Sequence, residues 1–103
     1  MENTVQLLTD EIKANLPKLY ATDGENDPMA WCKFFDPCGS WTWYVTEGEE
    51  QADGDWMFFG LVEGHEKEWG YFSLNELISV HGPLGLGIER DLYYEPTILA
   101  RSA

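Results

Sequence analysis

Five carboxylates are concentrated in one short stretch of the chain, 47–55, which has the sequence EGEEQADGD. Carboxylates can act as general acids and bases, and their oxygens can bind Ca²⁺ or Mg²⁺. The stretch lacks the DxDxDG order and the twelfth-position Glu of an EF-hand loop, so we predict no metal site. The chain has 19 acidic residues in all, and the sequence does not distinguish a catalytic pair among them.

The other reactive side chains are His65, His81, Cys32 and Cys38. Their spacing matches neither a zinc site nor a deaminase signature, and no nucleophile lies in a recognisable elbow. The glycine-rich stretch GPLGLG at 82–87 lacks the Lys and the Ser or Thr of a phosphate loop, so we expect it to form a turn. We therefore predict that the protein is not an enzyme, uses no cofactor and keeps both cysteines reduced.

Four of the tryptophans, Trp41, Trp43, Trp56 and Trp69, leave two interpretations open. Their rings could line a groove that holds a sugar or another small ligand. Packing in a hydrophobic core explains most of them more simply, because large aromatic side chains dominate core energetics.

The net charge of the chain is −13, from 19 acids and six bases. Nucleic-acid binding relies on Lys and Arg that neutralise phosphates, so we expect no direct binding to nucleic acid. The electrostatic complement of such a chain is a basic protein surface. A net charge far from zero also keeps a protein soluble and monomeric, and this simpler explanation needs no partner. We expect a monomer.

The 103 residues, of which 44% are hydrophobic and 15% aromatic, fit one folded domain over 1–103 rather than a disordered chain. There is no apolar run of about 18 residues, so we expect no membrane span. The N-terminal MENTVQLLTDEIK has acidic residues where a signal peptide would have basic ones. We therefore expect a cytoplasmic protein.

The elements that position these residues are predicted from periodicity and turn signals. Runs rich in Trp, Tyr, Phe, Thr and Val predict strands at 29–35, 41–46, 56–62, 68–72 and 88–94, with the acidic stretch 47–55 as a connecting loop. Alternation places Trp41, Trp43 and Val45 on the core face of their strand. The run WMFFGLVEG is apolar on both faces, which predicts a central strand covered on each side. Glu89, Arg90 and Asp91 in the last strand are expected to form an ion-pair cluster.

Two short helices are predicted. Leu8, Ile12 and Leu16 recur at a spacing of four residues after a possible Thr9 cap, which predicts a helix over 10–16. The sequence SLNE at 73–76 is a capping box that starts a helix over 74–80, which His81-Gly82-Pro83 would end. The predicted fold is α+β: an antiparallel sheet of four to five strands in a meander, with the two helices packed on it.

Four segments carry a family resemblance over nearly the whole chain: LLTDEIKANLPKLYAT, KFFDPCGSWTWYVTEG, FFGLVEGHEKEWGYFSLNEL and GPLGLGIERDLYYEPT. They resemble a family of small acidic bacterial domains of unknown function that are carried on plasmids, phages and integrative elements. This family includes an anti-CRISPR protein, an inhibitor of type II CRISPR nucleases. The resemblance therefore implies a biological role, and it supplies no catalytic residues.

The charge and the resemblance lead to one functional hypothesis. An RNA-guided nuclease holds its nucleic acids in positively charged channels, which an acidic domain could occupy as a nucleic-acid mimic. We therefore expect a non-enzymatic inhibitor whose partner is a type II CRISPR effector nuclease or its guide complex, with a partner-binding site made of Glu47, Glu49, Glu50, Asp53 and Asp55. The alternative is a regulatory or small-ligand-binding domain of mobile elements. An enzyme that uses paired carboxylates is a third, weaker possibility.

Overall fold

A computed structural model describes residues 6–80 and 86–100 and shows the α+β fold expected from the sequence. The elements follow one another along the chain as α1 (Asp10–Asn15), β1 (Met29–Ala30), β2 (Cys32–Phe35), β3 (Thr42–Glu50), β4 (Trp56–Glu63), β5 (Lys67–Ser73), α2 (Leu74–Ser79), β6 (Glu89–Arg90) and β7 (Thr97–Ile98). No helix in these described residues is long and apolar enough to cross a membrane.

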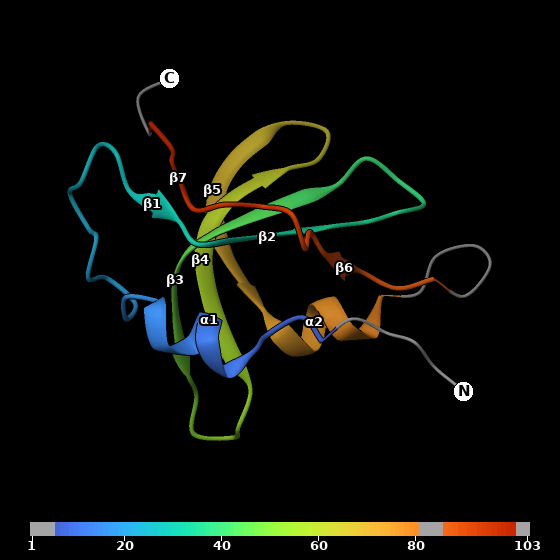
Figure 1. Cartoon of the computed structure of the whole chain (residues 1–103), viewed down its shortest axis with the longest axis horizontal. Coiled ribbons are helices and arrows are strands. Elements are labelled where there is room, and N and C mark those ends of the chain that lie inside the picture. The colour runs from blue at the N-terminus through green and yellow to red at the C-terminus, as the bar shows by residue number, and fades with distance from the viewer. Residues whose placement is uncertain (1–5, 81–85, 101–103) are drawn as a thin grey trace.

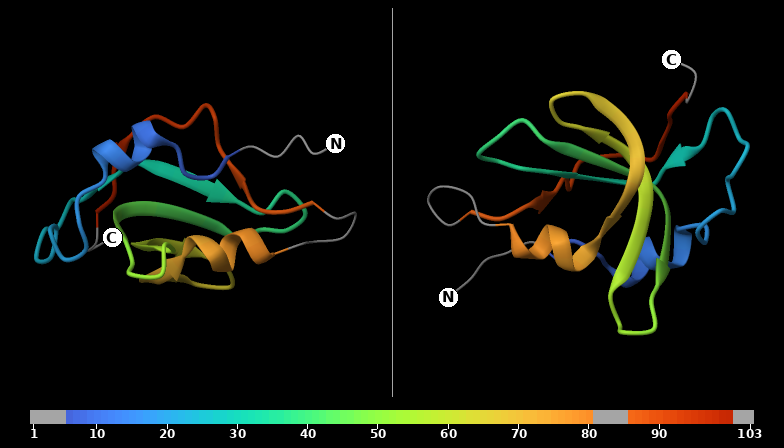
Figure 2. Two further views of the ribbon diagram at one scale, coloured as in Figure 1. Left: turned by 90° about the horizontal axis from the view of Figure 1, so that it is seen from below. Right: turned by 180° about the vertical axis from the view of Figure 1, so that it is seen from behind.

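The main sheet has five antiparallel strands in the order β5-β4-β3-β2-β6. Strands β2 to β5 form the predicted meander, and β6 returns to pair with β2 (Figure 1). A separate antiparallel pair joins β1 to β7, close to the β3 strand. The sheet curves strongly, so that β2 and the β4–β5 hairpin lie on opposite sides of the enclosed core (Figure 2).

Both helices begin at caps that the sequence predicts. The Thr9 side chain accepts a hydrogen bond from the Ile12 backbone N–H at 3.2 Å, and Ser73 with Glu76 forms the complete capping box. Helix α1 ends at Asn15 because Pro17 disfavours a helical Leu16, whose ψ is 126°. The proposed stop of the second helix at 81–83 lies outside the described residues.

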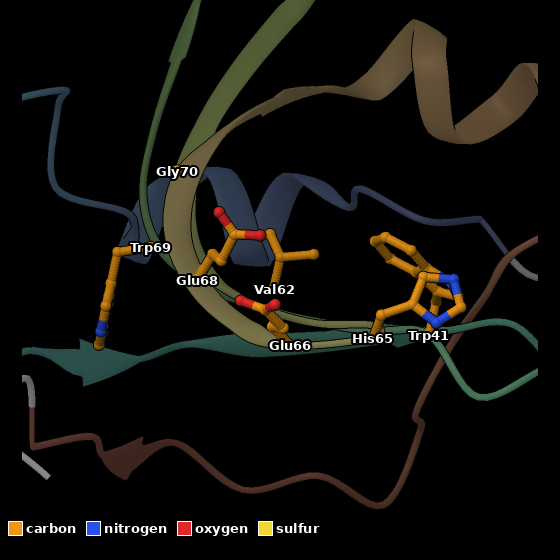
Figure 3. Close-up of a pocket in the computed structure, with 7 residues that line it drawn as sticks. All are labelled: Trp41, Val62, His65, Glu66, Glu68, Trp69 and Gly70. Carbon is orange, nitrogen blue, oxygen red and sulfur yellow. The ribbon is translucent and has the colours of Figure 1, made fainter.

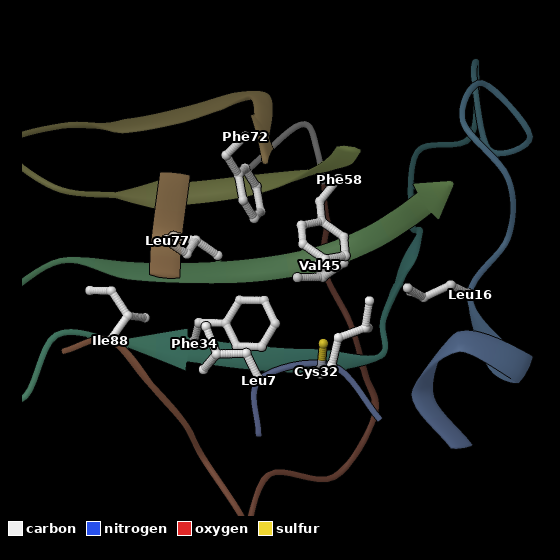
Figure 4. Close-up of a cluster of buried hydrophobic side chains, with 10 residues drawn as sticks. Leu7, Leu16, Cys32, Phe34, Val45, Phe58, Phe72, Leu77 and Ile88 are labelled. Atoms are coloured by element: carbon white, nitrogen blue, oxygen red, sulfur yellow. The ribbon is translucent and has the colours of Figure 1, made fainter. Parts of the chain in front are cut away.

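The core lies inside the curved sheet. Phe34, Val45 and Phe58 are fully buried at its centre, and Leu77 of α2 closes one side (Figure 4). The Phe34 and Phe58 rings meet edge to face, with 5.8 Å between centroids. The prediction that β4 is buried on both faces is wrong: Phe58 and Gly60 are buried, whereas the residues between and beyond them are only half-buried.

The predicted facing of the second strand is right for two of its three residues. Val45 is fully buried, and Trp43 is half-buried and packed against the core. Trp41 is 40% exposed because it precedes the first residue of β3 and its ring lies over the hairpin glycine Gly64 instead.

The last predicted strand, 88–94, is shorter than expected. Only Glu89 and Arg90 pair with β2, and a turn follows in which the Tyr94 N–H donates to the Asp91 carbonyl. The expected ion-pair cluster is also wrong, because Arg90 and Asp91 have other partners. The Asp91 carboxylate lies 3.7 Å from Lys33 Nζ, and Arg90 Nε donates to the carbonyl of Gln6 at 3.0 Å.

Candidate functional site

The first four residues of the acidic stretch 47–55 are strand rather than loop. Strand β3 continues to Glu50, and the connection to β4 is the turn over residues 51–55. The register shifts between Val45 and Glu47, so Thr46 is an extra residue in a β-bulge and its hydroxyl donates to the Phe59 carbonyl at 3.0 Å. Strict alternation would put Glu47 on the core face with Val45, and the bulge moves it to the other face, opposite Phe59.

Glu47 is a buried carboxylate, only 2% exposed. Its Oε1 accepts a hydrogen bond from the Tyr20 backbone N–H at 2.8 Å, and its Oε2 accepts one from the Thr22 N–H at 2.9 Å. The Thr22 hydroxyl also donates to Oε2. Buried charges persist in proteins when such bonds satisfy them. Glu47 therefore anchors residues 19–24 to the sheet and is not available to a partner.

Two further predicted site residues are also used within the fold. Glu49 Oε1 accepts a hydrogen bond from the Leu19 N–H at 3.2 Å. Asp55 Oδ1 accepts bonds from the Trp56 N–H at 2.7 Å and from the Asn75 N–H of α2 at 3.0 Å. Both side chains are half-buried. Glu49 therefore ties the segment before β1 to β3, and Asp55 ties the hairpin connection to the start of α2.

Glu50 and Asp53 remain exposed, so the five predicted residues divide into two kinds. Asp53 Oδ1 accepts a hydrogen bond from the Asp55 N–H at 3.0 Å, which shapes the turn. We call residues 50–55 the acidic tip. It protrudes from the body of the sheet at the end of the β3–β4 hairpin (Figure 1).

The side of the sheet away from the core carries an aromatic surface that the sequence reasoning missed. Cross-strand pairing places Tyr44, Leu61 and Trp69 in one row and Glu47, Phe59 and Tyr71 in the next. We call these six side chains the outer face. The Phe59 ring lies 4.9 Å from Tyr71 and 6.0 Å from Trp69, and Tyr20 adds a ring 6.2 Å from Tyr71. The sequence signal for this surface is the alternation in 68–72, which places Trp69 and Tyr71 on the face opposite to the buried Phe72.

The predicted tryptophan groove is only partly present. Trp43 and Trp56 pack against the core, whereas Trp41 and Trp69 border a shallow hollow of about 380 Å³. His65 lies beside Trp41 with 5.9 Å between ring centroids, at one end of the hollow (Figure 3). The complete lining is Trp41, Val62, His65, Glu66, Glu68, Trp69 and Gly70. Aromatic rings and carboxylates together favour a cationic ligand over an anionic one.

A second hollow of about 370 Å³ lies between α1 and residues 90–96. Cys32 lines its floor, and burial raises the pKa of that thiol to about 12, with the Arg90 charge opposing the rise. The cysteines are not bridged to each other, since Cys32 is buried and Cys38 is exposed. A thiol with so high a pKa is a poor nucleophile at neutral pH.

Within residues 6–80 and 86–100, no three His, Cys, Asp or Glu side chains are grouped closely enough to hold a metal ion. His65 is exposed in the short connection between β4 and β5. His81 lies outside the described residues.

Comparison with known proteins identifies a family. The sequence profile of a family described as a protein of unknown function (DUF2958) matches residues 6–100. No curated protein matches the chain significantly. No solved structure matches it significantly.

Proposed function

We propose that this chain, which belongs to the DUF2958 family, is a non-enzymatic inhibitor that binds a type II RNA-guided CRISPR nuclease or its guide complex. The inhibitor works by covering a basic surface that the nuclease needs for nucleic acid. It belongs to the mobile elements that such a nuclease attacks. The resemblance of the four segments quoted above supplies the role, and the charge of the surface supplies the mechanism.

The distribution of exposed charge is the observation that carries this proposal. Among the described residues only three exposed side chains are basic, Lys13, Lys18 and Lys67. Eleven exposed side chains are acidic: Asp10, Glu11, Asp23, Glu25, Asp27, Glu50, Asp53, Glu66, Glu68, Glu76 and Glu95. A negative electrostatic potential over most of a small protein accelerates association with a positively charged partner and opposes association with nucleic acid.

The acidic tip is the part of this surface best placed to enter a channel. It forms the end of a two-stranded hairpin, so it can reach into a groove that the body of the domain cannot enter. The domain measures 42 × 31 × 24 Å. The tip is the end of only two paired strands, which lie about 4.8 Å apart, so it is narrower than the shortest dimension of the domain.

A cleavage assay tests the proposal directly. A purified type II nuclease is loaded with guide RNA and given a matched DNA duplex, with and without a molar excess of the protein. Cleavage is expected to fall when the protein is added before the DNA, and less when it is added after the DNA has occupied the channel. Undiminished cleavage by type II nucleases of several subtypes, together with no complex on gel filtration, would rule the function out.

One observation favours a second candidate, a small-ligand-binding domain. The hollow beside Trp41 and Trp69 has a volume within the usual range for ligand sites, roughly 300–1,000 Å³. If the hollow is a ligand site, Trp41→Ala removes binding of a small cation without changing inhibition of a nuclease. Tryptophan fluorescence of the parent and variant proteins during titration with small organic cations separates the two functions.

A further inference from the structure

Tyr20 adopts a backbone conformation that needs support from its surroundings. Its φ is 71°, and it is the one described residue other than glycine with a positive φ. A bulky residue in this region is an outlier that persists only when neighbouring structure holds it, and such residues cluster at functional sites. The support here is Glu47, which binds the backbone N–H groups of Tyr20 and Thr22.

The side chain of Tyr20 is solvent-exposed. Tyr20 is 67% exposed and Tyr71 is 52% exposed, and their rings lie at 57° to each other. Phe59 and Trp69 continue the contact, so four rings form one connected group on the outer face, which we call the aromatic row. The buried carboxylate of Glu47 thus holds the exposed ring of Tyr20 in place. Packing of the core does not require an exposed ring at this position.

The charges around the aromatic row are negative. A hydrogen bond with the Tyr20 side chain is the main cause of a raised pKa at Tyr71, and the carboxylates of Glu47 and Asp23 raise it further. Negative charge beside an aromatic ring favours a cation over the ring face. Elsewhere on the outer face this already happens within the chain: Lys33 Nζ lies 5.7 Å from the Tyr44 ring centroid and 3.7 Å from Asp91.

Within the described residues, no Lys or Arg side chain makes a cation–π contact with Tyr20 or Tyr71. The two cation–π contacts within residues 6–80 and 86–100 involve Trp56 and Tyr44. Strand β5, which carries Tyr71, is also one of the two edge strands of the five-stranded sheet. The outer side of an edge strand offers backbone hydrogen bonds to an added strand, and the side chains of that strand then alternate between the two faces.

We propose that an extended, arginine-bearing segment of a partner protein lies along β5 and places an arginine side chain on the Tyr20–Tyr71 pair. This deepens the proposed function and rests on it for the identity of the partner protein. The guanidinium stacks on the exposed rings, and the nearby exposed carboxylate of Asp23 complements its charge. Arginine suits the site better than lysine because its planar head stacks on aromatic faces and is more weakly hydrated.

The test uses a fluorescently labelled eight-residue peptide of alternating arginine and threonine, whose arginines share one face when extended. Anisotropy titrations measure its dissociation constant with the whole protein. Tyr71→Thr and Tyr20→Asn remove one ring each without changing the charge, and Asn tolerates the positive φ. Each is expected to weaken binding by about three- to tenfold. Tyr71→Phe keeps the ring and is expected to bind within about threefold of the parent.

The matched control is Tyr93→Thr, which removes a ring that is 93% exposed and lies outside the aromatic row. It is expected to leave binding unchanged. Losses at Tyr71 and Tyr20 no larger than at Tyr93, or a parent protein that does not bind the peptide, would overturn the inference. So would free arginine that binds as tightly as the peptide at equal arginine concentration. Circular dichroism confirms that each variant is folded.

A parallel nuclease assay keeps this inference separate from the proposed function. If the Tyr71 and Tyr20 substitutions weaken peptide binding but the protein inhibits no type II nuclease, the arginine site is supported and the nuclease is rejected as the partner. If the protein inhibits a nuclease but the Tyr71 and Tyr20 substitutions do not weaken peptide binding, the proposed function is supported and the arginine site is rejected.

Discussion

The buried carboxylate of Glu47 accepts a hydrogen bond from the backbone N–H of Tyr20 at 2.8 Å, across 27 positions of sequence. This contact joins strand β3 to the segment before β1 and fixes an exposed ring on the outer face. Glu47, which the sequence predicts to bind a partner, therefore acts inside the fold. Its effect on a partner is indirect, through the position of Tyr20.

The first prediction concerns the stability that Glu47 provides. Glu47→Ala leaves two backbone N–H groups and the Thr22 hydroxyl without their acceptor. Buried donors left unsatisfied cost about 1–3 kcal/mol each and do not add fully, so the free energy of unfolding should fall by about 2–4 kcal/mol. Urea denaturation followed by tryptophan fluorescence measures the change.

Glu50→Ala is the matched control, because Glu50 lies on the same strand and is exposed. Its effect should stay within about 0.5 kcal/mol. Equal effects of the two substitutions would show that Glu47 has no anchoring role.

The sequence predicts those parts of the fold that depend on local signals. The capping box at Ser73 and Glu76 and the alternation of Trp43 and Val45 are properties of neighbouring residues, and the structure confirms both. The bulge at Thr46 is different. It depends on a register between β3 and β4 that no local pattern records, and it decides which face Glu47 occupies.

The aromatic row was not predicted for a related reason. Tyr20 lies in a loop and Tyr71 in a strand, and only the tertiary contact through Glu47 brings their rings together. Sequence alternation indicates that Tyr71 points away from the core. It does not indicate that a loop residue held at positive φ lies beside it.

The second prediction concerns the half-buried tryptophan of β3. Trp43 packs against the core without being enclosed, so Trp43→Ala should cost about 2–3 kcal/mol, less than the roughly 3–5 kcal/mol typical of fully buried aromatic residues. Trp41→Ala is the comparison, since Trp41 lies before the strand and is more exposed. A cost below about 1 kcal/mol for it is expected. Chemical denaturation of both variants checks the order, and a larger loss for Trp41 would contradict it.

The third prediction concerns the pH dependence of Cys32. Burial raises its pKa from 9.0 to about 12, so the folded protein retains the thiol proton more strongly than the unfolded chain does. The stabilisation is complete below pH 9.0 and is lost as the pH rises towards 12. In a Cys38→Ser background, the free energy of unfolding should therefore fall more steeply over this range than in the same background with Cys32→Ala. Identical slopes would show that Cys32 does not contribute.

Modification of the thiol gives an independent measurement in the same background. At pH 8 an aromatic disulfide reagent should react with Cys32 slowly in the folded protein and rapidly in urea, because the thiolate is the reactive form.

The fourth prediction concerns metal ions. Because no cluster of suitable ligands occurs in the described part of the chain, chelator, Ca²⁺, Mg²⁺ and Zn²⁺ should each leave the thermal unfolding midpoint unchanged. A ligand that binds only the native state must raise that midpoint. Differential scanning fluorimetry with each additive is the measurement, and a rise of several degrees with one ion would contradict the prediction.

The fifth prediction divides the five acids of 47–55 by mechanism. Glu50 and Asp53 are exposed on the acidic tip, so Glu50→Gln with Asp53→Asn should weaken nuclease binding and leave stability unchanged. Exposed ion pairs contribute about 0.2–1 kcal/mol each, which corresponds to a two- to thirtyfold loss of affinity for the pair. Surface plasmon resonance with immobilised nuclease measures the affinity, and denaturation measures the stability.

The matched control for the tip is Glu25→Gln with Asp27→Asn, which makes the same change of net charge in the exposed loop before β1. Diffuse attraction would weaken equally in both double variants, whereas a tip that enters a basic channel responds only to the first. Raising the salt from about 0.05 to 0.5 M shortens the screening length from roughly 14 to 4 Å, so binding should weaken for the parent and much less for the tip variant. Binding that survives both the tip substitutions and high salt would exclude an electrostatic mechanism and assign the interaction to the aromatic row, where Tyr71→Thr is then the decisive variant.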